Sequence, residues 1–537
     1  ERIGFSCITR FIPGVFFAPS PTRIAVGHFP LSCYTPGQLV RNVSQGALQM
    51  RRFLLLGLIT GFFTGCGTST PPAETNKDQP KTTSQLKPAG DAIASRSPSP
   101  DQAEVATAPA ASPQRGPTPE RDQLSAEAMA QVQKLEELTA QANAAQARFD
   151  FASAAGHWSS AMELLSTLYG PQAWQTTNAR LAAETASIQS KFTSTQLQAV
   201  KELYSSQTEI ARLLKESRHA PALELAQLSQ RITAELFGPG SWMMGKQWVQ
   251  VARLQQLNNQ PEAAIASYRE AILLHDQFLG EVHPDKETLH AYLGEAFLAA
   301  GQNRPAVDNL SKAALIAQRL WGDSSLKYAT RANDLGVAYQ RAGDLETAIR
   351  VFRAAESIRR RELGMDDPLV AHCLLNLGTV YMELSRHELA VQCFAQALPI
   401  LQAKLGVGSR MVVEGSLRYT AALVLAGQSQ MAERILGELV AALADRPGTS
   451  AERAVAQYRL AILQAKQGNY ALAEPNLKEA IEVQARLLGS EHPTTELSKQ
   501  ALVKVYEQTG RGAEAQTLQS QIRQVQYVEE DTQFKQR

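Results

Sequence analysis

The sequence has little cysteine, few aromatic residues and almost no net charge, and each shortage excludes a class of protein. Its 537 residues include five cysteines and no Cys-x-x-Cys, which excludes a disulfide scaffold or a paired zinc motif. Lysine plus arginine (53) exceeds aspartate plus glutamate (52) by one, so no field of one sign draws the chain to nucleic acid. Aromatic residues make up 7%, and alanine, leucine and glutamine dominate after about residue 123, which favours helices over sheets.

Sequence motifs of catalysis are absent as well. The chain contains no His-Glu-x-x-His, no Gly-x-Ser-x-Gly, no Gly-x-x-x-x-Gly-Lys-Ser/Thr and no Gly-x-Gly-x-x-Gly after a strand pattern. We therefore predict no catalytic residue, no metal site, no cofactor and no small-molecule substrate. The alternative is an enzyme with its site in 123–237, although that segment is mostly alanine, glutamine and leucine.

A short apolar run, Phe53–Phe63, follows Met50 and two arginines. It is too short to cross the ~30 Å bilayer core as a helix, and its basic flank is typical of a signal peptide. The Phe-Thr-Gly-Cys stretch that ends at Cys66 resembles the lipobox of bacterial lipoproteins, although phenylalanine stands where that family usually has leucine. The resemblance implies a signal peptide at 50–65 and lipidation of Cys66. An ordinary cleaved signal, a single anchor and a cytoplasmic chain are the alternatives.

Three other segments lack the pattern of a folded domain. No methionine precedes Met50, and residues 1–49 show no sustained period, so we predict that they are untranslated or disordered. Residues 66–122 hold ten of the 26 prolines among threonine, serine, alanine and glutamine, which predicts a disordered tether. The tail 524–537 is predicted to be disordered. With the lipobox, the tether places the protein outside the cytoplasm, anchored to a membrane.

A glycine recurs at a fixed interval through the second half of the chain. The spacing is 42 residues five times and then 41, which indicates structural repeats. Leucine and a basic residue often precede this glycine, as expected at a helix end in a left-handed conformation. The repeat landmarks are Gly238, Gly280, Gly322, Gly364, Gly406, Gly448 and Gly489.

Each period contains two apolar stripes separated by a turn residue, which predicts two antiparallel helices. In one period the first stripe includes Leu335-Gly336 and the second includes Phe352. The predicted turn residues are Asn259, Gly301, Gly343, Ser385, Gly427, Gly468 and Gly510. A proline follows His283, Asp367 and His492, which suits the first position of a helix, and we expect both histidines to form helix-end hydrogen bonds.

These landmarks resemble the tetratricopeptide repeat, and the 42-residue period with Leu-Gly-x-x-His-Pro resembles the repeats of kinesin light chains. The nearest matches are 279–284 and 488–493, and the pair Tyr419-Thr420 departs from the Leu-Gly pattern. The resemblance implies an all-α, right-handed superhelical solenoid of antiparallel helix pairs over 238–523. Nothing else resembles a kinesin light chain, so motor-cargo function is not carried over.

The segment 123–237 is also helical by pattern but lies off the register of the repeats. Tyr169-Gly170-Pro171 and Phe237-Gly238-Pro239 echo one another, each followed by a tryptophan three residues after the proline. We predict degenerate repeats that extend the solenoid. A coiled coil over 174–216 is the alternative, with three heptad positions in its favour.

Two cysteines and two histidines within one repeat suggest a metal site. However, antiparallel pairing about Ser385 offsets Cys373 from Cys393 by ~7.5 Å along helices that lie ~8–10 Å apart, beyond the reach of a disulfide. We therefore interpret Cys373 and Cys393 as buried, unpaired thiols. His372 and His387 are the two histidines.

In the resembled family, the first helices of the repeats line a concave groove that holds a peptide or a partner segment. The resemblance implies that Asn333 hydrogen-bonds a peptide backbone. The groove set holds one arginine and two glutamates and lacks a pair of basic residues, so no strongly charged ligand is expected. Carried over by position, the groove residues are Thr288, Glu295, Thr330, Asn333, Val337, Gln340, Arg341, His372, Thr379, Met382 and Glu383.

The sequence therefore favours a non-enzymatic protein–protein interaction scaffold that binds a peptide or partner segment and is tethered to a membrane. A cytoplasmic adaptor similar to kinesin light chains is one alternative. Binding of a cell-envelope polymer is another, and exposed aromatic residues along the groove would favour it.

Overall fold

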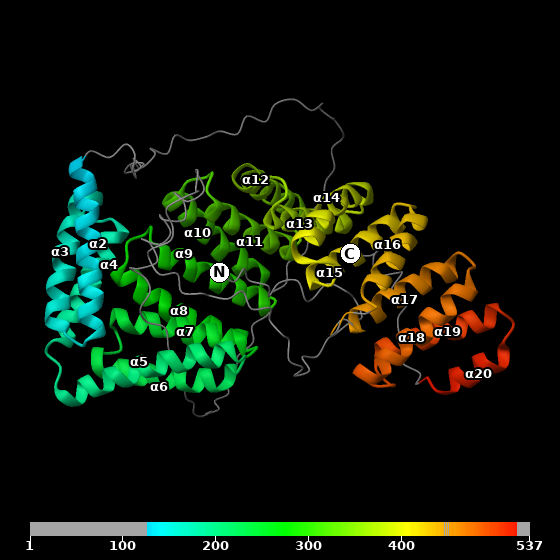
Figure 1. Cartoon of the computed structure of the whole chain (residues 1–537), viewed down its shortest axis with the longest axis horizontal. Helices are drawn as coiled ribbons and strands as arrows, with labels where there is room; N and C mark the ends of the chain where they lie inside the picture. The colour runs from blue at the N-terminus through cyan, green and yellow to red at the C-terminus, as the bar shows by residue number, and fades with distance from the viewer. Residues whose placement is uncertain (1–125, 445, 447, 449, 523–537) are drawn as a thin grey trace, which may run out of the picture. The chain divides into compact units, whose positions relative to one another are not determined.

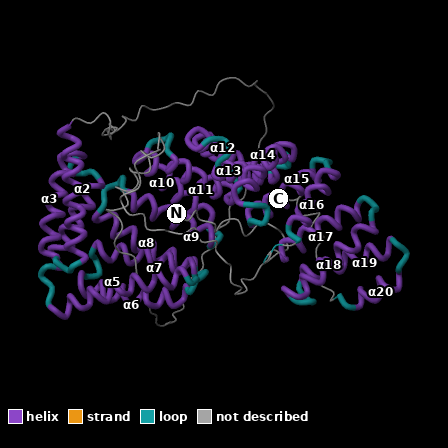
Figure 2. Tube along the Cα trace, in the orientation of Figure 1, coloured by secondary structure: helices purple, strands orange, loops and turns teal. Residues whose placement is uncertain are grey.

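The structure is a computed structural model that describes residues 126–444, 446, 448 and 450–522. The predictions for 1–49, 50–65, 66–122 and 524–537, Cys66 included, lie outside these residues. Within them the chain forms nineteen α-helices and no strand (Figure 2). None of these helices combines the length and apolarity that a bilayer span requires. The predicted all-α stack of helix pairs is confirmed.

The described residues fall into two compact units, 126–247 and 248–522, divided within α7 (Trp242–Leu257). Figure 1 labels the helices of both. The N-terminal unit contains α2 (Ala126–Ala147), α3 (Phe151–Tyr169), α4 (Trp174–Gln189), α5 (Ser194–Lys215) and α6 (His219–Phe237). The C-terminal unit contains α8 (Pro261–Phe278), α9 (Pro284–Ala299), α10 (Asn303–Trp321), α11 (Leu326–Ala342), α12 (Leu345–Leu363), α13 (Pro368–Glu383), α14 (His387–Leu405), α15 (Arg410–Leu425), α16 (Ser429–Ala442), α17 (Ser450–Lys466), α18 (Tyr470–Leu488), α19 (Pro493–Gln508) and α20 (Gly512–Ser520).

An additional helix explains why the N-terminal unit is off register. The hairpins α2–α3 and α5–α6 turn at Phe149 and Ser217, both with positive φ (60° and 57°), and α4 lies between the hairpins in the chain. The alternative of one coiled-coil helix over 174–216 is wrong. The helix ends at Gln189, and Thr193 starts α5 with a capping box in which its side chain accepts from the backbone N–H of Gln196.

The turns within the repeats follow the prediction. All seven predicted turn residues have positive φ, from 55° at Ser385 to 84° at Gly343. The predicted helix-end hydrogen bonds of the two histidines are also present. The Nδ1 atoms of His283 and His492 accept from the backbone N–H groups of Asp285 and Thr494, at 3.0 and 3.3 Å. Asp367 accepts in the same way, at 2.8 Å, from the N–H of Leu369.

The recurring glycines differ from the prediction in two respects. Where they end a helix, as Gly322 and Gly364 do, φ is 88–89° but ψ is 157–169°, so the conformation is not left-handed α. It belongs to a region that only glycine tolerates. Gly280 and Gly448 are not helix ends: Leu279 caps α8, and α16 already ends at Ala442.

In three successive helix pairs, α9–α10, α11–α12 and α13–α14, a large side chain packs on a glycine of the partner helix. A Cβ atom on Gly336 would lie 2.6 Å from Phe352 Cε1, and one on Gly378 would lie 2.7 Å from Phe394 Cε1. Both phenylalanines are fully buried. The glycine of the Leu-Gly pair therefore permits the close approach of α11 to α12 and of α13 to α14.

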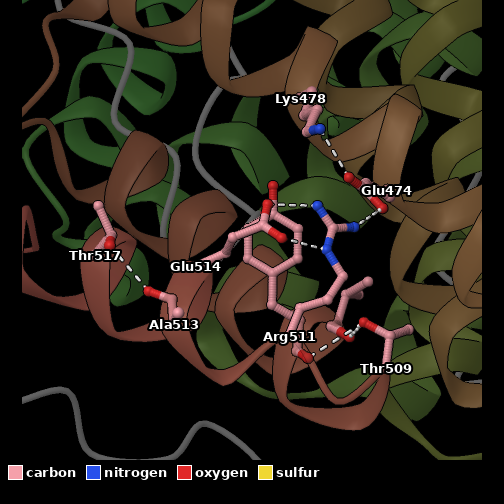
Figure 3. A network of polar contacts seen from close by, with 9 residues as sticks. Glu474, Lys478, Thr509, Arg511, Ala513, Glu514 and Thr517 are labelled. Carbon is pink, nitrogen blue, oxygen red and sulfur yellow. Dashed lines mark hydrogen bonds and ion pairs between the residues drawn. The ribbon is translucent and has the colours of Figure 1, made fainter.

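The last helix packs on the stack through apolar residues, and one arginine, shown in Figure 3, adds polar contacts. Arg511, the N-cap residue of α20, donates to Glu514 at 2.5 and 2.6 Å and to Glu474 of α18 at 2.7 Å. Its guanidinium also lies 4.3 Å from the ring centroid of Tyr506 in α19. Lys478 pairs with the same Glu474 at 2.7 Å, so two cations and two carboxylates tie α18, α19 and α20 together.

Candidate functional site

The first helices of successive repeats form one face of the C-terminal unit. α9 contacts α11, α11 contacts α13, α13 contacts α15, and α17 contacts α19. Among the described residues, no contacts of comparable extent join successive second helices. The first helices thus lie closer to one another than the second helices do. We call the surface carried by α9, α11, α13, α15 and α17 the inner face.

The eleven groove residues expected from the sequence all lie on α9, α11 and α13, and ten of them are half-buried. Asn333 departs from its predicted role because it is 4% exposed. Its Oδ1 accepts from Asn376 Nδ2 at 3.0 Å and from Cys373 Sγ at 3.7 Å. Asn333 therefore joins α11 to α13 and is not free to bind a peptide backbone. Val337 and Met382 pack partly against the apolar core.

A cluster of three carboxylates and one arginine lies on α9 and α11. Arg331 forms ion pairs with Glu287 and, at 3.1 Å, with Asp334. Burial raises the pKa of Asp334, and the nearby charge of Arg331 acts in the opposite direction. Thr288 donates to Glu287 at 3.2 Å. The sequence analysis did not identify Arg331, Asp334 or Glu287.

Glu295 stands beside this cluster without a direct partner. No described residue forms a hydrogen bond or ion pair with its carboxylate. Burial, and then the nearby charge of Asp334, raise the pKa of Glu295 to about 7, although Arg331 and Arg253 act in the opposite direction. The inner face at α9 and α11 thus holds a carboxylate that lacks a counter-ion.

Replacing Glu295 with glutamine is expected to stabilise the protein at high pH. Because the folded pKa lies above the unfolded value of 4.5, the charged carboxyl costs stability above pH 7, and this cost disappears as the pH falls towards 4.5. We expect a gain of about 1–3 kcal/mol at pH 8.5 and almost none at pH 4.5. Urea unfolding at both pH values measures the difference, and a gain that does not depend on pH would contradict the assignment.

The middle of the inner face contains hydrogen bonds between neighbouring repeats, each with one ionisable side chain. Gln340 Nε2 donates to Glu383 at 2.6 Å, and Thr379 Oγ1 accepts from Arg418 at 3.1 Å. Burial raises the pKa of Glu383. Thr330 hydrogen-bonds only within its own helix, to the carbonyl of Leu326 at 2.9 Å.

A small hollow opens between α13 and α15. His372 lies at its edge, and burial and then Arg359 lower the pKa of this histidine to about 4, so the ring is neutral at pH 7. Gly415 permits close packing beside the hollow, because a Cβ atom would lie 2.9 Å from Leu398 Cδ2. The lining residues are His372, Leu375, Asn376, Met411, Glu414, Gly415 and Arg418.

Two arginines occupy equivalent positions on α15 and α17. Arg418 donates to Thr379, and Arg459 donates to the carbonyl of Leu417 at 2.9 Å. Neither forms an ion pair with a described residue. Burial lowers the pKa of both. The charges of Glu414 and Glu383 act in the opposite direction at Arg418, and the charge of Arg418 contributes to the lowering at Arg459. Glu414, the acid nearest in sequence to Arg418, pairs instead with Arg410 at 2.6 Å.

The repeat position of these arginines was a signal that the sequence analysis missed. In every repeat one residue directly precedes the position of the Leu-Gly pair. In four successive repeats this residue is Asp334, Asn376, Arg418 and Arg459. The predicted groove set ended at Glu383, and therefore omitted this pair. With Arg418 and Arg459 included, the inner face does carry two neighbouring basic residues.

The two thiols are unpaired, as predicted, but only Cys373 is fully buried. Arg359 Nη1 contacts Cys373 Sγ at 3.2 Å. Burial raises the pKa of Cys373 and of Cys393 to about 11, so both remain protonated at neutral pH. Among the described residues, no group of three or more histidine, cysteine, aspartate or glutamate side chains is arranged to hold a metal ion.

The comparisons with known proteins agree with this geometry. The sequence profile of the family described as "Tetratricopeptide repeat" matches residues 327–403 and 452–526, which include α12, α13, α18 and α19. No protein with a curated description matches the sequence.

Solved structures with similar folds have low sequence identity to this chain. A putative kinesin light chain of Podosopora anserina with nearly identical TPR-like repeats is 21% identical, with 38% of this chain and 98% of that chain covered and a TM-score of 0.36. BtubC (BKLC) of P. vanneervenii is 19% identical, with 47% of this chain and 92% of that chain covered and a TM-score of 0.36. A signal transduction ATPase of Pyrococcus horikoshii with a tetratricopeptide repeat sensor is 14% identical, with 68% of this chain and 51% of that chain covered and a TM-score of 0.45.

Tetratricopeptide repeats typically act as protein–protein interaction scaffolds. The paired antiparallel helices and the positive φ at each turn are the features that the matched segments share, and 327–403 also has a glycine beneath each of two buried phenylalanines. The chain therefore carries tetratricopeptide repeats at residues 327–403 and 452–526.

Proposed function

We propose that this protein is a non-enzymatic scaffold whose inner face binds a segment of a partner polypeptide. The observation that carries the proposal is the row of half-buried polar side chains on successive first helices, from Glu295 on α9 to Arg459 on α17. Charged groups that are partly removed from water and lack a counter-ion gain hydrogen bonds when a ligand covers them. The alternative of an enzymatic site within 123–237 has no comparable observation in its favour.

A random peptide library provides the test. We would select phage-displayed 16-residue peptides on the full chain, synthesise the enriched ones with a benzophenone group, and map the photo-crosslinks by mass spectrometry. Crosslinks are expected on α9, α11, α13, α15 and α17. Crosslinks on the second helices, α10, α12, α14 and α16, would contradict binding at the inner face, as would the failure of any peptide to be enriched over the bare support.

We further propose that the protein is exported and anchored to a membrane through acylation of Cys66. The support is the basic residues, short apolar run and Phe-Thr-Gly-Cys stretch at 50–66, followed by the proline-rich segment. The intact mass of the protein from its source cells is the test. A chain that begins at Cys66 with two to three acyl chains is expected. An unmodified chain that begins at Met50 would contradict the anchor and leave the repeat assignment unchanged.

A further inference from the structure

We infer that the inner face is electrically polar along its length, and that its partner is a polypeptide segment with a basic side chain over α9 and an acidic side chain over α15 and α17. This inference rests on the proposed function and specifies the chemistry and the direction of the ligand. It differs from the expectation, drawn from the sequence alone, that the ligand is not strongly charged.

The acidic end is formed by Glu295 and its neighbours. Glu287, Glu295 and Asp334 supply three carboxylates, and the only arginine that pairs with any of them, among the described residues, is Arg331. Arg253 lies over the ring of Tyr292, 4.9 Å from its centroid, and forms no ion pair with these acids. Glu295 is thus left to accept a charge-assisted hydrogen bond from a lysine or arginine of the partner.

The basic end is formed by Arg418 and Arg459. Each guanidinium donates to one neutral oxygen of the neighbouring repeat, at 3.1 and 2.9 Å, and each retains further N–H donors. Arg459 reaches the carbonyl of Leu417, the residue before Arg418, so the two like charges lie close enough to repel. A carboxylate between them would relieve the repulsion and accept from both, so this end suits an aspartate or glutamate of the partner.

Between the two ends, Arg341 on α11 and Glu383 on α13 carry opposite charges, and although burial raises the pKa of Glu383, the charge of Arg341 acts in the opposite direction. Glu383 accepts from Gln340, and Glu414 is paired with Arg410. His372 is neutral, since its pKa is about 4. A partner that lies in the reverse direction would place its acid against Glu295 and its base against the two arginines, and both contacts would be repulsive.

The number of repeats between the ends predicts the spacing of the two charges in the partner. Three steps separate α9 from α15, and packed helices lie about 8–10 Å apart, which gives ~24–30 Å. An extended chain advances ~3.3–3.6 Å per residue. The basic and acidic residues of the partner should therefore be separated by about seven to nine positions.

The experiment uses the random 16-residue peptides selected on the full chain. Enriched sequences are expected to hold lysine or arginine in one half and aspartate or glutamate in the other, in one order only. A fluorescein-labelled member of the set is then compared by anisotropy with a peptide of the same composition whose two charges are exchanged. The exchanged peptide is expected to bind at least about tenfold more weakly.

Paired variants separate the two ends. E295Q, and the double change R418Q with R459Q, should each weaken the selected peptide about tenfold. The matched controls are E388Q on α14 and R434Q on α16, which alter the same charges at exposed positions on second helices. They should leave binding unchanged. A peptide whose basic residue is replaced by glutamate should bind E295K better than it binds the original chain.

The outcomes distinguish this inference from the proposed function. Enriched peptides that crosslink to the inner face but show no charge order, or that bind E295Q and the double arginine variant normally, would overturn the inference alone. Failure to enrich any peptide would overturn both. A concentration-dependent dimer in light scattering that excludes the peptides would assign the face to a second copy of the chain, which also overturns the inference.

Discussion

Replacing Phe352 with alanine is expected to lower the free energy of unfolding by about 3–5 kcal/mol. The ring is fully buried and lies directly over Gly336, where its nearest atoms would be 2.6–2.9 Å from a Cβ. Because Gly336 has no side chain to move into the vacated space, the cavity would persist, and residual cavity volume adds to the cost of lost apolar burial. Urea unfolding followed by circular dichroism measures the change.

Two further variants, F352L and L315A, test whether the loss of stability comes from the packing of the Phe352 ring. F352L keeps most of the apolar volume and should cost less than about 1.5 kcal/mol. Leu315 on α10 is 47% exposed, so L315A should change stability by less than about 1 kcal/mol. If F352A and L315A were equally mild, the contact between α11 and α12 would not be what holds this repeat together.

The fold was largely predictable because its signals are local. A turn residue with positive φ and a helix that starts at His283-Pro284 or Asp367-Pro368 depend on neighbours within a few residues, and the 42-residue period repeats these signals. Gly280 and Gly448 show the limit of this reasoning. They keep the spacing, but the helices before them end earlier, so position in the repeat does not determine where the last helical turn stops.

The site was less predictable because partners from different repeats are about 40 residues apart in sequence. The eleven carried-over residues do lie on the first helices, but no local pattern shows that Asn333 is covered by Asn376 and Cys373. No local pattern shows that Arg331 pairs with Glu287, which is 44 residues away in sequence. No local pattern shows that Glu295 lacks an ion-pair partner among the described residues. The comparison of one repeat position along the whole stack could have identified Arg418 and Arg459, since it needs only the period.

The second large effect is expected from R331M. Arg331 is 17% exposed at its side chain and Glu287 only 6%, so removing the guanidinium leaves a carboxylate in a site from which water is largely excluded. Breaking such a pair from one side costs about 3–5 kcal/mol, and the charges of Asp334 and Glu295 add to the repulsion. R350M, an exposed arginine on α12, is the matched control and should change stability by less than about 0.5 kcal/mol.

The pH dependence of R331M identifies the carboxylates as the cause. Without the arginine, the folded pKa values of Glu295 and Asp334, which burial already raises, rise further above their unfolded values. The penalty is therefore complete above the raised pKa values and disappears as the pH falls towards 4. Unfolding of R331M should therefore approach that of the original chain at low pH. Adding E287Q to R331M should recover part of the loss at pH 8, because it removes the buried charge that the arginine compensated. A loss that is the same at pH 8 and pH 4.5, and that E287Q does not reduce, would mean that Arg331 acts through its apolar stem and not through its charge.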